Sequence, residues 1–482
     1  MASWNHTVKF TTNSKDAHDE TTANVSRNSA DFYRVQPAVD RRVHIMGVGN
    51  VGSFIAHAIR GIPNPPPVTL VFPNWEKLNA WNESPKNLTL VTEGDAEVRD
   101  GFDAELAIPR IRYHGTEVGV NTASPDTSGD TGPQALPGES AEPISSLIIC
   151  SKAPYVLQGL SSVKHQLHKD SVILFLQNGM GVIAEVNREI FPDPATRPHY
   201  MLGINSHGMH ASPDQRFTTV HAGFGTISLG ILPHDRDRNP DAPYLPDIKF
   251  TAKSPTPLYP EPPEELDPEY LPPTSAKFPF TPNQRYLLRT LLRTPVLSAA
   301  AYSPPDLLQM QLDKLAVNCI INPLTVLLDA RNGAILNNYA LTRTIRLLLS
   351  EISLVIRSIP ELQYIPNVQQ RFEPGRLETV VVAVAHKTRD NVSSMLADVR
   401  LGVQTEIDYI NGWVVKRGEE LGIRCAMNYM VTQLVKGKRI VIQREMDEGV
   451  PLVRSRGRGR AETGVVVRKR KAKADMNTDE EL

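Results

Sequence analysis

The sequence predicts an α/β protein in two parts, a doubly wound parallel sheet followed by an all-α domain. Up to about residue 230, short apolar runs alternate with helical stretches, which indicates parallel strands joined by crossover helices. From about Gln284 to Lys438 the pattern changes to long amphipathic runs of helical spacing. Between the two parts, residues 231–282 hold 14 of the chain's 39 prolines, a composition typical of an extended connector.

Four buried strands and one helix are expected in the N-terminal half. The apolar run VHIMGVG at 43–49 ends in glycine, and a helix is predicted to follow over about 51–60. The turn IPNPPP leads to a second strand, VTLVF at 68–72. SLIICSKA at 146–153 and SVILFLQNG at 171–179 supply the next two strands.

The composition is that of an ordinary globular protein. The 482 residues are 40% hydrophobic and 22% charged, with a net charge of −1, so the chain as a whole is not biased toward nucleic acid or membrane. Cys150, Cys319 and Cys425 lack CxxC spacing, which argues against a zinc site or a disulfide framework and fits a reducing compartment. Without a long apolar run or a signal-type N-terminus, we expect a cytoplasmic protein, with mitochondria as the alternative.

Three glycines after the first strand have the spacing of a dinucleotide-binding turn. Gly47, Gly49 and Gly52 form G-x-G-x-x-G between a strand and a helix, and another strand ends about twenty residues later. The first glycine permits a tight turn, the second lets the pyrophosphate approach, and the third lets helix and strand pack closely. The pattern predicts a Rossmann domain; the alternative is a glycine-rich turn that binds nothing.

The form of the nicotinamide cofactor is not indicated by the usual residues. An acid at the end of the second strand would bind the ribose of NAD, and an arginine there would bind the 2′-phosphate of NADP. Here that strand is followed by Pro73-Asn74-Trp75-Glu76-Lys77, with neither residue in place. Lys77 or Arg60 could meet a 2′-phosphate.

The composition changes divide the chain into five segments. The C-terminal segment has nine Lys or Arg between Arg454 and Lys473. It is either a solvated tail or a patch for nuclear import or nucleic acid binding. The predicted segments are a disordered N-terminus (1–40), the Rossmann domain (41–230) with a surface insertion (116–143), the Pro-rich connector (231–282), the helical substrate domain (283–450) and the basic disordered tail (451–482).

Two polar clusters in the helical part are candidates for the chemistry. Lys314, Asn318 and Asn322 fall within about 80° on one face of an otherwise apolar helix, before Pro323 perturbs it. A core helix seldom buries such a stripe, because each buried polar group needs a partner. The alternative is a stripe that faces solvent.

The second cluster lies at 391–413. Ser393, Ser394 and Asp398 precede Gly402, and Glu406 follows it. Ser394 and Glu406 are about 120° apart on a continuous helix, so they can share a site only if the chain breaks between them, and Gly402 is a plausible break. The alternative for Glu406 is an acid that favours a helix N-terminus.

Six stretches together resemble the ketopantoate reductase (2-dehydropantoate 2-reductase) family, in its longer fungal form. They are GVGNVG, CSKA, LQNGMG, KLAVNCIINPLT, the NG at 332–333 and SSMLADVRLGVQTEIDYINGW, in family order over roughly 41–230 and 284–437. The resemblance implies a C-terminal domain like that of 6-phosphogluconate dehydrogenase. It also implies NADPH as cofactor, although the missing arginine departs from the family pattern.

The resemblance also assigns roles to residues. It makes Lys314 the general acid and Glu406 an active-site carboxylate. It implies substrate binding by Asn318, Asn322, Asn332 and Ser394, and cofactor binding by Gly47, Val48, Gly49, Asn50, Val51, Gly52, Lys152 and Asn178. No metal is expected.

The implied reaction is the reduction of ketopantoate to pantoate in pantothenate and coenzyme A biosynthesis. One alternative is a related reductase that acts on another 2-oxo or β-keto acid. The other is a non-catalytic regulatory protein that retains the fold, which predicts the loss of Lys314 or Glu406, yet both are present. The expected partner is a small 2-oxo acid; membrane or nucleic acid binding is not expected, and a homodimer is compatible with the sequence.

Overall fold

The computed structural model describes residues 39–107, 111–113, 116–118, 140–234, 280–363 and 365–449. Most of the predicted N-terminal disordered segment, of the insertion and of the Pro-rich connector, and the whole of the basic tail, lie outside these residues. The chain divides into Met1–Arg41 and Arg42–Leu482, and every described helix and strand belongs to the second unit.

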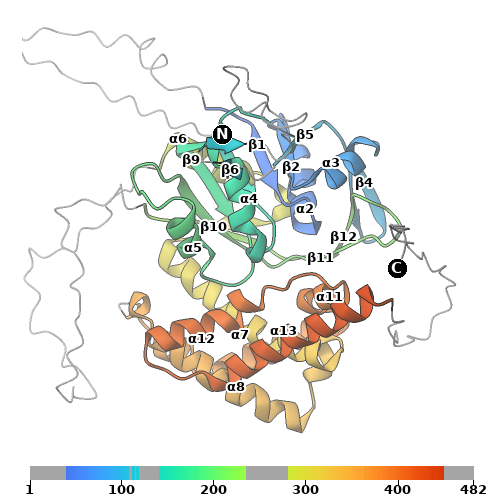
Figure 1. Cartoon of the computed structure of the whole chain (residues 1–482). Coiled ribbons are helices and arrows are strands. Elements are labelled where there is room, and N and C mark those ends of the chain that lie inside the picture. Colours follow the sequence, from blue (N-terminus) through green and yellow to red (C-terminus); the bar gives the residue numbers. More distant parts are fainter. Residues whose placement is uncertain are drawn as a thin grey trace, which may run out of the picture. The chain divides into compact units, whose positions relative to one another are not determined.

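A mostly parallel sheet forms the first lobe of this unit, as predicted (Figure 1). Its order is β14-β13-β10-β9-β8-β1-β2-β5, and β13 is antiparallel to β10 while the other pairs are parallel. The central strands are fully buried apolar runs, which fits a sheet covered on both faces. The strands are β1 (Val43–Met46), β2 (Val68–Phe72), β5 (Phe102–Leu106), β8 (Ile144–Ile149), β9 (Leu167–Phe175), β10 (His199–Asn205), β13 (Ile227–Ile231) and β14 (Ala299–Ala301).

A second, smaller sheet packs on this lobe and was not anticipated from the sequence. Its order is β11-β12-β3-β4, and β12 pairs in parallel with β3 from a distant part of the chain. It contacts helix α2, so that helix lies between two sheets. Its strands are β3 (Leu88–Thr92), β4 (Asp95–Arg99), β11 (Gly208–Ala211) and β12 (Thr218–Gly223); a further hairpin, β6 (Ile111–Tyr113) and β7 (Thr116–Val118), leads into the predicted insertion.

The first lobe extends beyond the expected start of the helical domain at residue 283. Helix α6 (Pro282–Leu292) contacts β9, and β14 adds a strand to the edge of the large sheet. The other helices of this lobe are α2 (Asn50–Arg60), α3 (Trp75–Asn82), α4 (Val156–Val163) and α5 (Val182–Glu189).

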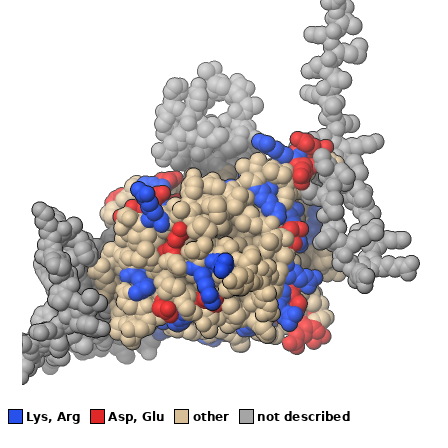
Figure 2. Space-filling model, turned by 90° about the horizontal axis from the view of Figure 1, so that it is seen from below, with Lys and Arg blue, Asp and Glu red and all other residues tan. Residues whose placement is uncertain are grey.

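The second lobe is helical and is arranged around α7 (Pro304–Leu328) (Figure 1). α7 contacts α8, α10, α11 and α13, and the apolar core of the lobe includes its side chains Leu315, Ile320 and Leu324. The surrounding helices are α8 (Tyr339–Arg357), α9 (Val368–Arg371), α10 (Pro374–Lys387), α11 (Ser394–Arg400), α12 (Asn411–Glu420) and α13 (Ala426–Asp447). Among the described residues, no helix has the length and apolar character needed to cross a membrane. On the face of this lobe shown in Figure 2, acidic and basic residues are interspersed among uncharged ones.

Pro323, where the sequence predicts a perturbation, removes one hydrogen bond of α7 without ending the helix. The helix continues to Leu328. A proline at this position has no N–H for the carbonyl of Cys319, four residues earlier. The side-chain amide of Asn411 donates to that carbonyl at 2.9 Å, and Asn411 is fully buried. A long-range hydrogen bond therefore replaces the missing bond within the helix.

A buried pair of histidines connects three segments of the first lobe. Nε2 of His207 lies 3.0 Å from the carbonyl of Leu297, which can only accept, so this nitrogen carries the proton. Nδ1 of His207 then accepts from His221 at 3.0 Å and from the N–H of Gly225 at 3.2 Å. Burial lowers the pKa of both histidines, which fits a neutral pair.

We predict that this pair makes the protein sensitive to acid. Because the folded-state pKa values lie below that of an unfolded histidine, the pair contributes stability above about pH 6.5 and loses it as the pH falls. Between pH 7.5 and 5.5 the melting temperature of the His207→Gln/His221→Gln variant should fall less than that of the wild type. The difference should be about 3 °C for each kcal/mol of unfolding free energy that the pair loses over this pH range. Calorimetry tests this, with exposed His210→Gln as the control; equal falls in wild type and double variant would contradict it.

Candidate active site

The glycine-rich turn has the geometry expected of an anion-binding loop. Gly47 has φ +93°, and a Cβ on it would lie 2.3 Å from the backbone nitrogen of Ser151. A Cβ on Gly52 would lie 2.2 Å from the carbonyl oxygen of Gly47, whereas a Cβ on Gly49 would meet nothing within 4 Å. The first and third glycines are therefore required by packing, and the second leaves an open face. No side chain caps the start of α2, so its first N–H groups are available to a phosphate.

The turn after β2 distinguishes the two candidate cations for a 2′-phosphate. Asn74 caps α3 and accepts from the backbone N–H of Lys77 at 2.9 Å, while the side chain of Lys77 is exposed in the first turn of that helix. Arg60 ends α2 and donates to the carbonyl of Asp100. Since α2 is 11 residues long, Arg60 is about 15 Å from the glycine-rich turn. Arg60 therefore lies at the opposite end of α2 from that turn, whereas Lys77 directly follows β2.

Lys314 lies in a cleft between α7 and the ends of β9 and β10. Its ammonium donates to the carbonyl of Asn205 at 2.7 Å. Burial lowers the pKa of Lys314 to about 8, and the negative charge of Glu406 opposes this shift. The cleft measures about 10 Å³, room for one water molecule, so a larger ligand requires it to widen. It is lined by Gln177, Asn178, Gly179, Gly203, Ile204, Gln311, Lys314, Leu315 and Asn318.

Glu406 is buried where the helical lobe meets the first lobe. Its carboxylate accepts from the backbone N–H of Ala153 at 3.2 Å and from the side-chain amide of Asn178 at 3.0 Å. α11 ends at Arg400 and Gly402 follows with φ +68°, so the chain breaks where expected. Glu406 faces the first lobe and does not serve as a solvated helix-terminal acid.

Lys152 and Asp398 form an ion pair between the lobes, which sequence reasoning missed. Burial raises the pKa of Asp398 to about 6, although the hydrogen bond from Lys152 opposes the shift. The only signal for it in the sequence was the position of Asp398 four residues after Ser394, on the same face of a helix.

A third contact between the lobes involves Tyr409, also not anticipated. Its hydroxyl donates to Glu185 at 2.8 Å, and its backbone carbonyl accepts from the N–H of Met180 at 2.8 Å. A Cβ on Gly179 would lie 2.3 Å from that carbonyl oxygen, so the glycine of the LQNGMG stretch permits the approach.

The structure does not place the remaining predicted residues in the lining of the cleft. Asn322 is buried further along α7. The side-chain NH₂ of Asn332 donates to the hydroxyl of Thr388 at 3.0 Å, and its side-chain amide oxygen is buried without a partner among the described residues. Ser394 is exposed, whereas its neighbour Ser393 is buried and bonds to Thr325 at 2.7 Å.

A larger hollow elsewhere on the helical lobe lacks comparable chemistry. It measures about 430 Å³ and is open to solvent. Both of its arginines are paired with the single carboxylate of Asp313, which offsets part of their positive charge. Its lining is Gln309, Pro366, Asn367, Gln370, Arg371 and Arg376.

Two family descriptions cover most of the described chain. "Ketopantoate reductase PanE/ApbA" matches residues 43–234, and "Ketopantoate reductase PanE/ApbA C terminal" matches residues 306–439. Among solved structures, a PanE/ApbA family ketopantoate reductase from Ralstonia eutropha has a TM-score of 0.54 at 16% identity, over 83% of this chain and 99% of that one. D-mandelate dehydrogenase with NADH and anilino(oxo)acetate has a TM-score of 0.52 at 16% identity, with the same coverage. At these identities the likeness shows the fold alone.

Curated relatives extend the match over most of the chain. A probable 2-dehydropantoate 2-reductase of Schizosaccharomyces pombe is 25% identical over 83% of this chain and 97% of its own length. The ketoisovalerate reductase BEA2 of Gibberella fujikuroi is 24% identical over 80% of this chain and 79% of its own length. A 2-dehydropantoate 2-reductase of Shigella flexneri is 33% identical over 63% of this chain and 77% of its own length. The chain belongs to the ketopantoate reductase family.

Proposed function

We propose that this chain, by its family an NAD(P)H-dependent oxidoreductase acting on small 2-oxo acids, reduces 2-dehydropantoate to pantoate with NADPH. The observation that carries the proposal is the position of Lys314. Its ammonium lies in a cleft at the ends of β9 and β10. Burial lowers the pKa of Lys314, and the negative charge of Glu406 opposes that lowering. Family membership and the named fungal and bacterial relatives support the substrate.

The side chains at the cleft suit the reduction of a carbonyl group. A bound nicotinamide supplies the hydride to C2 of the 2-oxo acid, and negative charge then develops on the carbonyl oxygen. Lys314 can stabilise that charge and donate the proton. The carboxylate of Glu406 favours the charged form of Lys314, so that a proton is available near neutral pH.

We assign the other roles on the same basis. The turn Gly47–Gly52 holds the pyrophosphate, and Lys152 and Asn178 lie next to the nicotinamide half. Lys77 is the cation that we propose for the 2′-phosphate, since it is exposed directly after β2. Substrate binding is assigned to Asn318, Asn322, Asn332 and Ser394, of which Asn318 lines the cleft as it stands. Cytoplasmic location and a homodimer remain proposals.

A second candidate is reduction of another 2-oxo acid. It is favoured by the match to ketoisovalerate reductases from two fungi, each over 80% of this chain. Ketoisovalerate lacks the hydroxyl group of ketopantoate, and the amide of Asn318 in the cleft favours the more polar compound.

Replacing Lys314 by Met should abolish most turnover without loss of cofactor binding. Methionine keeps much of the side-chain volume but removes the proton, so kcat should fall by about 10²- to 10⁴-fold. Steady-state oxidation of NADPH with ketopantoate measures the change, and fluorescence titration measures the Kd for NADPH. A loss of NADPH affinity as large as the loss of kcat would contradict the general-acid role; surface Lys86→Met is the control.

The pH profile should report the charge on Lys314. Because the ammonium is the acid, kcat/KM should fall as the pH rises through about 8. Glu406→Gln removes the charge that supports the ammonium, so this limb should move to lower pH. Glu378→Gln, which breaks a surface pair with Arg346, is the matched control and should leave the profile unchanged. An unmoved limb in Glu406→Gln would refute the electrostatic role of Glu406.

A further inference from the structure

The polar stripe on α7 begins one turn earlier than the residues considered so far. Gln311 precedes Lys314 by three residues and Asn318 by seven, so the three side chains lie within about 60° around the helix. All three line the same cleft. Gln311 is therefore part of the site by position, although neither the sequence motifs nor the proposed roles include it.

The side-chain amide of Gln311 is free to bind a ligand. Two other amides of the cleft already donate within the protein: Gln177 to the carbonyl of Ile149 at 3.0 Å, and Asn178 to Glu406. Among the described residues, no hydrogen bond is formed by the side chain of Gln311. Gln311 is half-buried at the cleft, so its amide can bind a ligand there without breaking a hydrogen bond within the protein.

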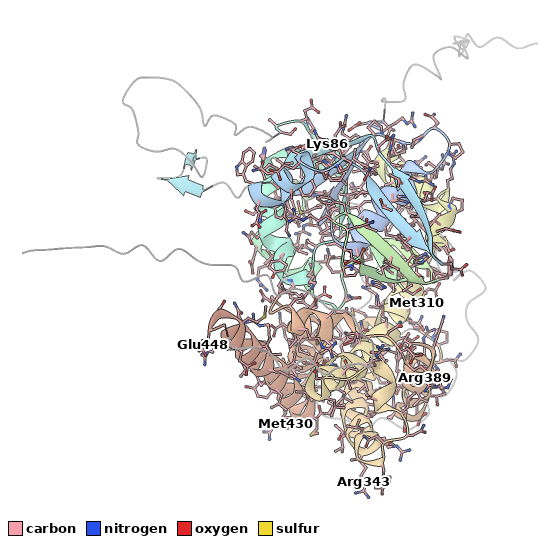
Figure 3. All side chains as sticks on the ribbon, turned by 90° about the vertical axis from the view of Figure 1, so that its right-hand side faces the viewer. Lys86, Met310, Arg343, Arg389, Met430 and Glu448 are labelled. Atoms are coloured by element: carbon pink, nitrogen blue, oxygen red, sulfur yellow. The ribbon has the colours of Figure 1, made fainter. Side chains whose placement is uncertain are left out.

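Gln311 lies beside the segment that is assigned to the nicotinamide half. It lines the cleft together with Asn178 and Gly179, which follow β9, and with Gly203 of β10. Its neighbour Met310 lies where the two lobes meet in Figure 3. In parallel α/β sheets the dinucleotide lies across the carboxyl ends of the strands. Gln311 therefore lies in the cleft beside the segment after β9, to which Asn178 and the nicotinamide half are assigned above.

We propose that Gln311 positions the nicotinamide by pairing with its carboxamide group. A glutamine amide offers one acceptor oxygen and an NH₂ donor, and the carboxamide of nicotinamide offers the same two groups, so two reciprocal hydrogen bonds can form. This contact fixes the rotation of the ring one helical turn from the ammonium of Lys314. The proposal depends on one part of the proposed function, the binding of a nicotinamide cofactor.

Binding measurements on the whole chain test the proposal without turnover. Calorimetry gives the Kd of wild type and Gln311→Leu for NADPH and for 2′,5′-ADP, which carries the adenosine half but no nicotinamide. We expect Gln311→Leu to weaken NADPH about 10-fold or more, from the loss of two hydrogen bonds, and to leave 2′,5′-ADP within about 2-fold. The matched control is Gln309→Leu on the same helix, whose amide bonds to Pro305 and which lies outside the cleft.

Three other outcomes overturn the proposal. Unchanged binding of both ligands would show that Gln311 does not touch the cofactor, and weakening of both would show a general effect on the fold. Unchanged NADPH binding with a raised KM for the 2-oxo acid would assign Gln311 to the substrate. If the wild type binds NADH and not NADPH, the proposed cofactor is wrong, and the same comparison is made with NADH and 5′-AMP.

Discussion

The burial of the Glu406 carboxylate is the constraint on which the arrangement of the site depends. A carboxylate with 7% exposure needs donors, and its two come from different loops of the first lobe, the backbone of Ala153 and the amide of Asn178. Both loops follow strands of the parallel sheet, at the edge where such sheets bind dinucleotides. The same charge opposes the lowering of the Lys314 pKa. The same buried carboxylate therefore joins the two lobes and favours the charged form of the acid between them.

Helix α7 positions Lys314 at the cleft because it packs against both lobes. Its first turns contact β13, its middle presents Lys314 to the cleft, and its later turns form the centre of the helical core. Such a role requires a long straight helix, and Pro323 would be expected to interrupt it. The amide of Asn411 compensates by binding the carbonyl that the proline leaves unpaired. Asn411 also donates to Asn428 on α13, so the residue that replaces the missing helix bond is held by a second helix of the lobe.

Local signals in the sequence predicted the main parallel strands, the glycine-rich turn and the shared helix face of Lys314 and Asn318. The glycine spacing predicted the turn before α2, and the helical spacing of Lys314 and Asn318 predicted that they share a face. The second sheet was missed because β12 pairs with a strand more than a hundred residues away, and local patterns do not show which distant segments pair. The Lys152–Asp398 pair was missed for the same reason, since its partners are 246 residues apart. The exposure of Ser394 follows from which serine caps α11, which helical spacing does not decide.

The roles proposed for the cleft residues all depend on one reaction. The most direct measurement is the rate of NADPH oxidation by the purified chain with ketopantoate, beside ketoisovalerate and beside NADH as the reductant. These roles predict the highest kcat/KM for the pair of ketopantoate and NADPH. Faster turnover of ketoisovalerate would assign the site to the second candidate substrate, and no oxidation of either cofactor with any 2-oxo acid would contradict the catalytic role of Lys314 and Glu406.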